Sequence, residues 1–361
     1  MKKKTLSIAL SVLMLVSMLI PFSAFAGIKN DEMKKQVQDD IAGEVAYLNF
    51  TPSLDKAVSS QMLFRVDQSK KHGFLTELSV NLVQNDGKII VNGAENAIYY
   101  AVAINILDIL GEDYTNYRGY NLKEIFENCT QTNIENPYYV MQAVEAARTI
   151  GNDALAKRYI DKLIEDTYTM GSGMNYYGYS ADNNGMFLAT VGYYKDDYQA
   201  YVDDAKALLE SKKTANGYDS GYGVSASTTT CALLAYTILG EEDKAVEAYK
   251  LLVDNFESPN NNGVMQYDGE DNAYATSQAV RSLSYFVEMF DDEQTEPTPG
   301  DPGVDSDDNK PTDAQPKKDA DKAQTKSDAS VKSPQTGASV AGFAVIGLGA
   351  ALLACTKKKE N

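Results

Sequence analysis

The sequence offers few side chains of the types that usually perform catalysis or bind transition metals. Its 361 residues include one histidine, His72, and three cysteines, Cys129, Cys231 and Cys355. A His/Cys zinc cluster and a cysteine-rich disulfide scaffold each need more of these residues, so both are excluded. His72 follows two lysines in a polar segment, where a solvated turn residue is expected rather than a general base. We expect Cys129 and Cys231 to be small buried residues, and we predict no catalytic residue, metal or cofactor.

Tyrosine is the one chemically versatile residue that the sequence uses heavily. There are 24 tyrosines and no tryptophan. Six tyrosines lie in glycine-containing segments between expected helices, and we call these six the tyrosine rim: Tyr176, Tyr177, Tyr179, Tyr218, Tyr222 and Tyr267. Aromatic rings with a polar tip stack on sugar rings and fill protein interfaces. The sequence therefore predicts a binding surface for a glycan or a protein. The alternative is that these rings pack between structural repeats.

Acidic residues dominate the charge of the chain but form no predicted metal or catalytic site. There are 51 Asp and Glu against 33 Lys and Arg, a net charge of −18. This balance argues against nucleic acid as a partner, because phosphate binding needs an excess of basic residues. Asp268, Glu270 and Asp271 could hold calcium but lack the ligand spacing of a known calcium loop, so we expect a solvated turn. Residues 305–308 match a terpene-cyclase acid motif as a string, but their proline-rich acidic surroundings offer no cavity to raise a carboxyl pKa.

These side chains must be positioned by a helical repeat over residues 27–290. Helices that are apolar on nearly every side alternate with helices that carry one apolar stripe, as in Cys231–Leu239 and Asp243–Phe256. The first kind should be buried and the second should form an outer layer. Six inner helices are expected to start near Leu54, Ala97, Tyr138, Met186, Thr229 and Ala275. Six outer helices are expected near residues 33–48, 73–84, 121–129, 153–168, 197–212 and 242–256. This repeat predicts an all-α fold, either a solenoid or a closed ring of helical hairpins.

The two ends of the chain carry targeting signals. Residues 1–26 combine three lysines, an apolar run and Ala24-Phe25-Ala26, the pattern of a cleaved secretory signal peptide. An uncleaved membrane anchor is the alternative. Residues 291–332 hold five of the ten prolines and no aromatic residue, so we expect a disordered stalk. Residues 338–355 are apolar and long enough to cross a membrane as a helix, and the three lysines at 357–359 favour the cytoplasmic side.

The pentapeptide before this apolar run completes a known pattern. It consists of Ser333, Pro334, Gln335, Thr336 and Gly337. The tail from residue 333 to residue 361 resembles the cell-wall sorting signal of Gram-positive surface proteins, in which a sortase reads a Leu-Pro-x-Thr-Gly motif. The resemblance implies a membrane-inserted precursor that the sortase cleaves after Thr336 and joins covalently to peptidoglycan. Ser333 departs from the Leu of the commonest motif and leaves the class of sortase open.

Several stretches of the repeat region resemble the prenyltransferase/squalene-oxidase-repeat surface proteins of Gram-positive bacteria. They are Gly119–Leu122, Thr228–Thr230 before Ala232–Ala235, and residues 268–272 before residues 275–279. The resemblance covers about residues 31–290 and implies an α6/α6 toroid, shared with terpenoid cyclases, protein prenyltransferases and corrinoid carriers. Tyr stands where the repeat normally has the Trp or Phe of a Gly-Gly-Trp or Gly-Gly-Phe loop. The inner helices also lack the cyclase acid motif, one histidine cannot complete the prenyltransferase zinc site, and the small β domain of the carriers does not follow.

The function predicted from these observations is that of a non-catalytic, wall-anchored protein that binds an extracellular ligand through the tyrosine rim. Its expected partners are a sortase, peptidoglycan through Thr336, and an unidentified glycan or protein. One alternative is a small-molecule, corrinoid-like carrier, which would have an apolar pocket in the ring. Another is an extracellular enzyme acting on polysaccharide, which would have paired carboxylates with shifted pKa values inside the ring.

Overall fold

The computed structural model describes residues 27–290, and this part of the chain is mostly helical. The predicted signal peptide 1–26, the stalk 291–332, the sorting motif Ser333–Gly337 and the apolar run 338–355 lie outside the described residues. Among the helices of the described part, none combines the length and apolarity that crossing a membrane requires. The helices and strands described below therefore all belong to the predicted repeat region.

Twelve α-helices occupy residues 27–290, at the places where the sequence predicts six outer and six inner helices. The outer helices are α1 (Asp31–Leu48), α3 (Lys71–Gln84), α5 (Leu122–Asn128), α7 (Asp153–Thr167), α9 (Gln199–Glu210) and α11 (Glu242–Phe256). The inner helices are α2 (Ala57–Val66), α4 (Ala97–Ile109), α6 (Val140–Thr149), α8 (Ala181–Val191), α10 (Ala226–Leu239) and α12 (Ala273–Phe286). Short 3₁₀ turns lie at Leu54–Lys56, Pro137–Tyr139, Gly192–Tyr194 and Val287–Met289.

Two inner helices begin earlier than the sequence pattern predicts. We expected starts near Met186 and Thr229, but α8 begins at Ala181 and α10 at Ala226. The hydroxyls of Ser180 and Ser225 accept hydrogen bonds from the backbone N–H groups three residues later and so cap these helices. The first turns are rich in polar residues, which hid them from an argument based on apolar periodicity.

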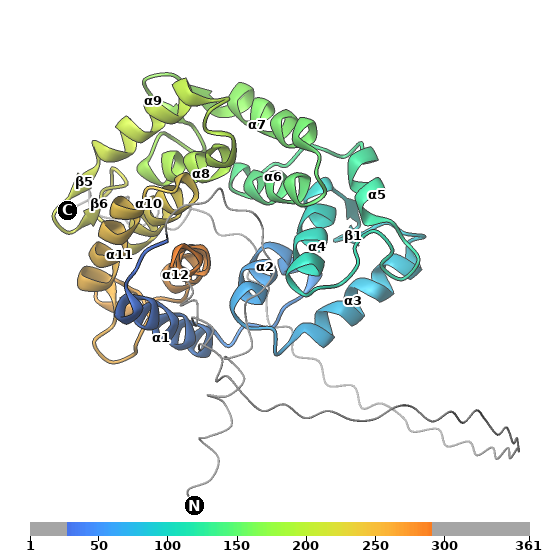
Figure 1. Cartoon of the computed structure of the whole chain (residues 1–361), viewed down its shortest axis with the longest axis horizontal. Coiled ribbons are helices and arrows are strands. Elements are labelled where there is room, and N and C mark those ends of the chain that lie inside the picture. The colour runs from blue at the N-terminus through green and yellow to red at the C-terminus, as the bar shows by residue number, and fades with distance from the viewer. Residues whose placement is uncertain (1–26, 291–361) are drawn as a thin grey trace, which may run out of the picture. The chain divides into compact units, whose positions relative to one another are not determined.

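The inner helices lie around the centre of this part of the chain and the outer helices cover them (Figure 1). Each inner helix packs against the next, from α2 through α4, α6, α8 and α10 to α12. Helix α12 in turn packs against both α1 and α2, so the last inner helix meets the first. Next to this contact, the backbone N–H of Ile28 donates to Met289 O at 2.8 Å and joins the two ends of the described chain.

The expected difference between the two kinds of helix is confirmed by burial. Thirteen of the fourteen residues of α10 are buried, whereas α11 buries only one stripe, Ala245, Ala248, Tyr249 and Leu252. An inner helix such as α10 is enclosed by its neighbours, while an outer helix such as α11 has one face in water. Burying one large apolar side chain contributes roughly 1.5–3 kcal/mol, so the inner layer supplies most of the apolar stabilisation.

Four short antiparallel hairpins lie between an outer helix and the next inner helix. They pair β1 (Ile90–Val91) with β2 (Ala94–Glu95), β3 (Tyr168–Thr169) with β4 (Gly173–Met174), β5 (Lys213–Thr214) with β6 (Gly217–Tyr218), and β7 (Gln266–Tyr267) with β8 (Glu270–Asp271). The side chain four residues after the N-cap of each following inner helix accepts a hydrogen bond of 3.0–3.2 Å from a backbone N–H of the hairpin segment. The acceptors are Tyr100, Asn184, Thr229 and Thr276. This shared bond fixes each of the four hairpins to its inner helix. The repeat is hard to see in the sequence because the acceptor is a different type of residue in different repeats.

Candidate functional site

Four members of the tyrosine rim are exposed, as the sequence predicts. The exposed fractions are 81% for Tyr177, 51% for Tyr179, 89% for Tyr222 and 62% for Tyr267. Each of these residues lies in a segment that leads into the N-terminus of an inner helix. Because outer and inner helices alternate along the chain, connections of this kind come together at one end of the helical assembly. The four exposed rings therefore lie on loops at the same end of the helical assembly.

The prediction for Tyr218 is wrong, because this ring belongs to the core. Tyr218 lies on β6, is 1% exposed, and packs with its ring centroid 6.5 Å from that of Tyr236. Its backbone N–H donates to Thr229 Oγ1 at 3.1 Å, which holds the strand against α10 and turns the ring inward. Tyr176 is intermediate: it is half-buried, with ring contacts to Tyr138 at 5.7 Å and to Tyr177 at 4.5 Å.

Sequence analysis did not single out Tyr274, an exposed aromatic residue near the rim loops. It is 56% exposed although it lies in the first turn of α12, a helix that the sequence predicts to be buried. The neighbouring helices do not cover the first turn of α12. The sequence signal for this position was Asn272, a typical N-cap residue two positions before Tyr274. Tyr274 therefore extends the exposed tyrosine surface.

The other candidate residues take structural positions. His72 is exposed in the first turn of α3, and Cys129 and Cys231 are buried free thiols. Burial raises the pKa of Cys231 to about 12, so its thiol stays protonated and unreactive. Asp268 and Glu270 are exposed at the β7–β8 turn, and neighbouring Asp271 accepts hydrogen bonds from Asn261 and Gln266. Within residues 27–290, no group of three or more His, Cys, Asp or Glu side chains is arranged to hold a metal ion.

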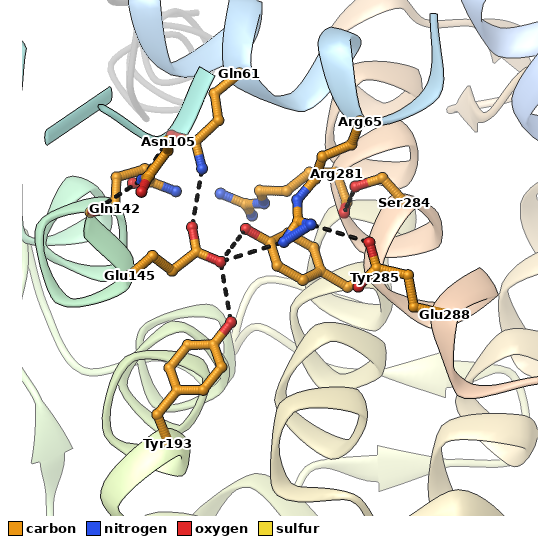
Figure 2. Close-up of polar contacts among 10 residues, drawn as sticks. All are labelled: Gln61, Arg65, Asn105, Gln142, Glu145, Tyr193, Arg281, Ser284, Tyr285 and Glu288. Atoms are coloured by element: carbon orange, nitrogen blue, oxygen red, sulfur yellow. Dashed lines mark hydrogen bonds and ion pairs between the residues drawn. The ribbon is translucent and has the colours of Figure 1, made fainter. Parts of the chain in front are cut away.

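At the centre of the assembly, one buried carboxylate connects four segments of the inner layer (Figure 2). Glu145 of α6 accepts hydrogen bonds at Oε1 from the hydroxyls of Tyr285 at 2.7 Å and Tyr193 at 3.0 Å. Its Oε2 accepts from Gln61 Nε2 at 2.9 Å, and Arg65 Nη2 lies 3.5 Å from Oε1. The four partners come from α2, α12 and the turn after α8. We call these five residues the Glu145 hub.

Arg65 extends the Glu145 hub to a second carboxylate. Its Nη1 lies 3.0 Å from Glu288 Oε1, and its guanidinium carbon lies 3.8 Å from the ring centroid of Tyr285. Burial raises the pKa of Glu288 and the charge of Arg65 opposes that rise. Two carboxylates therefore share one arginine, whose positive charge partly offsets the repulsion between them.

Three further polar side chains in the same region have atoms without a hydrogen-bond partner among the described residues. These atoms are Asn105 Oδ1, Gln142 Oε1 and Arg281 Nε, all of them buried. Asn105 uses its amide nitrogen to reach Gln61 Oε1 at 3.2 Å, which connects this group to the Glu145 hub (Figure 2). The inner layer therefore holds two buried acceptors and one buried donor that have no hydrogen-bond partner among residues 27–290.

Sequence analysis did not single out the residues of the hub. The sequence analysis described the inner helices as apolar on nearly every side and did not consider the amide or charged residues within them. The signal that could have found them is their recurrence: α2, α4, α6 and α12 each place amide or charged side chains inside an otherwise apolar helix, namely Gln61, Arg65, Asn105, Gln142, Glu145 and Arg281. Charged residues are almost never fully buried unless paired, so such positions indicate partners in the interior.

No model of a known protein family matches the chain, and neither does any curated protein or solved structure. The family resemblance and the resemblance of the tail to a sorting signal therefore stay predictions. What the chain does must be argued from the exposed tyrosines and the buried hub.

Proposed function

We propose that this protein is a wall-anchored extracellular binding protein whose residues 27–290 form an α6/α6 toroid of the terpenoid-cyclase-like kind. Support for the toroid comes from the alternation of six outer and six inner helices and from the contact of α12 with α2. Support for secretion and anchoring comes from the two terminal sequence patterns, with sortase and peptidoglycan as partners and Thr336 as the attachment point. The toroid binds a glycan or protein outside the cell, and it does so without catalysing a reaction.

The observation that carries this proposal is the group of exposed tyrosine rings at one end of the helical assembly. Tyr177 and Tyr222 are more than four-fifths exposed, and Tyr179, Tyr267 and Tyr274 are more than half exposed. Single exposed aromatic residues are ordinary, but several on neighbouring loops form a surface that typically contacts a partner. Tyrosine supplies large contact area with few rotatable bonds, which suits a binding surface on loops.

Glu145 serves as an acceptor for protein side chains, which favours a structural role. Its Oε1 accepts from the hydroxyls of Tyr193 and Tyr285 and its Oε2 from Gln61, so a general base at this position would have to use the remaining lone pair of Oε2. The polysaccharide-degrading alternative keeps one supporting observation, the second carboxylate, Glu288, whose pKa is raised by burial. The carrier alternative is weakened because Arg65, Glu145 and Arg281 place charge where an apolar ligand would lie.

Changing Tyr177, Tyr222 and Tyr267 together to Ala should abolish binding to the target surface and leave the fold intact. These rings are exposed, so their removal costs little stability, while each aromatic contact contributes roughly 0.5–1.5 kcal/mol to binding. The measurement is binding of the purified chain to bacterial and host-cell surfaces, with circular dichroism as the fold control. The matched contrast is Tyr218→Ala, which removes a buried ring and should lower stability by about 3–5 kcal/mol. Unchanged surface binding by the folded triple variant would contradict the proposal.

Covalent anchoring is expected to make the mature protein resistant to detergent. If Thr336 is bonded to peptidoglycan, boiling in detergent should leave the protein in the wall, and a muralytic enzyme should then release it. The chain carrying Thr336→Ala should instead be extracted by detergent alone, because the acyl group that the sortase transfers belongs to this residue. Complete extraction of the unmodified chain by detergent would show that the tail acts only as a membrane anchor.

A further inference from the structure

Tyr177, in the middle of the loop 175–179, has a backbone conformation that tyrosine rarely adopts. Its φ is +55°, in the left-handed region. In this region the Cβ of any residue except glycine crowds the neighbouring carbonyl oxygen, so the conformation lowers stability. Burial does not offset this loss: the ring contacts that of Tyr176, at 4.5 Å between centroids, but the Tyr177 side chain is 81% exposed. The loop therefore holds an exposed ring in a strained conformation.

The loops that carry the other strongly exposed rim residues avoid this conformation for tyrosine. Beside Tyr222, glycines on both sides take the positive φ angles, +103° and +123°. The residue after Tyr267 is an aspartate with φ +54°, and aspartate tolerates the left-handed region better than most residues. Within residues 27–290, Tyr177 is the one aromatic residue with a positive φ. Glycine at this position would permit the same turn, so the turn itself does not require the tyrosine.

A buried amide of the next inner helix holds this loop. Asn183 of α8 is 1% exposed, and its Nδ2 donates to Tyr176 O at 3.2 Å and to Gly178 O at 2.6 Å. These two carbonyls belong to the residues on either side of Tyr177. The Oδ1 of Asn183 accepts from Tyr138 Oη at 2.8 Å, and this bond directs the donor end of the amide toward the loop. One side chain therefore ties both sides of the strained residue to the inner layer.

We propose that Tyr177 is the main contact residue of the tyrosine rim and that Asn183 is its positioning residue. Strained backbone persists where the surrounding structure enforces it, and it gathers at binding and catalytic sites. A ring that is held in place before binding loses less conformational entropy when a partner contacts it, so the contact contributes more to affinity. This inference rests on the proposed binding function and names the loop through which the partner is bound.

Comparing alanine with glycine at the same position tests the backbone strain. Tyr177→Gly and Tyr177→Ala both remove the ring, and they differ only in the Cβ that a positive φ disfavours. The glycine chain should melt about 2–4 °C above the alanine chain. Tyr222 is the matched control: its φ is not positive, so Tyr222→Gly should melt no higher than Tyr222→Ala. A Tyr177→Gly chain that melts no higher than Tyr177→Ala would overturn the inference.

Repeating this comparison in the Asn183→Ala chain tests the positioning residue. Without the two bonds from Asn183, residue 177 can leave the left-handed region, so the advantage of glycine over alanine should disappear. A merely structural role of Asn183 would lower both melting temperatures and leave their difference unchanged. Asn183→Leu, which fills the space without a donor, is used if the alanine chain does not fold. Tyr138→Phe removes the third bond of Asn183 and is the control that should keep the difference. An undiminished difference in the Asn183 variant would contradict the positioning role.

Binding of the purified chain is measured on the bacterial and host-cell surfaces used for the triple variant. Tyr177→Gly should weaken it at least about tenfold, as expected for a main contact, and Tyr222→Gly by a smaller factor. Asn183→Ala keeps every rim tyrosine and should still weaken binding, because the ring is no longer held in place. Unchanged binding by Tyr177→Gly, with loss in the triple variant, would overturn this inference and leave the proposed function standing. Unchanged binding by the triple variant, or no binding by the unmodified chain, would overturn both.

Discussion

Replacing Glu145 with Ala is expected to lower the free energy of unfolding by about 3–5 kcal/mol, the range for breaking a buried ion pair from one side. The substitution leaves the hydroxyls of Tyr193 and Tyr285 without their acceptor and removes one partner from buried Arg65. Because the hub connects α2 and α12 to α6, the loss also weakens the contact between the first and last inner helices. Urea unfolding followed by circular dichroism measures the effect.

Asp197→Ala is the matched control for this substitution. Asp197 pairs with Lys157 at 2.8 Å, but both side chains are exposed, so its loss should cost less than about 1 kcal/mol. A Glu145→Ala chain as stable as the unmodified one would show that the hub does not stabilise the packing of α6 with α2 and α12. An increase in stability would instead indicate that Glu145 is a binding or catalytic group whose burial destabilises the folded chain.

The positions of the helices could be predicted because the distribution of apolar residues within a helix indicates how much of its surface is buried. An inner helix such as α10 is apolar all round and an outer helix such as α11 is apolar on one stripe, and both patterns lie within one short segment. The hub could not be predicted in this way. Glu145 meets Gln61 and Tyr285, which are 84 and 140 residues away in the sequence. Such distant residues come together only when α2, α6 and α12 pack around one centre, which no single segment of the sequence reports.

Within one loop of the tyrosine rim, the sequence pattern does not distinguish a buried tyrosine from an exposed one. Tyr218 and Tyr222 lie four residues apart in the same glycine-containing segment, yet one is 1% and the other 89% exposed. The difference comes from Thr229, which accepts the backbone N–H of Tyr218 and fixes the hairpin against α10. At Gly217, φ is +128° and an added Cβ would lie 2.7 Å from the same Thr229 oxygen, so only glycine permits this approach. Nothing in the order of residues 216–223 distinguishes the two rings.

A buried acidic cluster joins α1 to the segment between α11 and α12. Asp40 accepts hydrogen bonds from Tyr249 Oη at 2.7 Å and Asn262 Nδ2 at 3.2 Å. Glu44, one turn further along α1, is fully buried, and neither of its carboxylate oxygens has a hydrogen-bond partner in residues 27–290. Burial and the neighbouring carboxyls of Asp40 and Glu257 raise the pKa of Glu44 well above its usual value. Burial is also the main cause that raises the pKa of Asp40 from 3.8 to about 6.

These shifts predict that the closure becomes less stable as the pH rises. A carboxyl whose pKa is higher in the folded chain than in the unfolded chain binds more protons when folded, so stability falls as the pH rises through that interval. For Asp40 the interval runs from about pH 4 to above pH 6. Below pH 4 this loss is absent, because the carboxyl is protonated in both states.

Glu44→Gln should therefore stabilise the protein at pH 8 by upwards of about 1 kcal/mol, because glutamine has no carboxyl that must be kept protonated in the folded chain while it is ionised in the unfolded chain. The same substitution should have little effect at pH 4, where Glu44 itself is protonated and resembles glutamine in shape and polarity. Urea unfolding at pH 4, 6 and 8 measures the difference between the two chains, which cancels the titration of every group that they share. Glu32→Gln, on the exposed first turn of α1, is the control and should show no gain that grows with pH. An equal gain at pH 4 and pH 8, or a loss at pH 8, would mean that Glu44 is not held as an uncompensated buried acid.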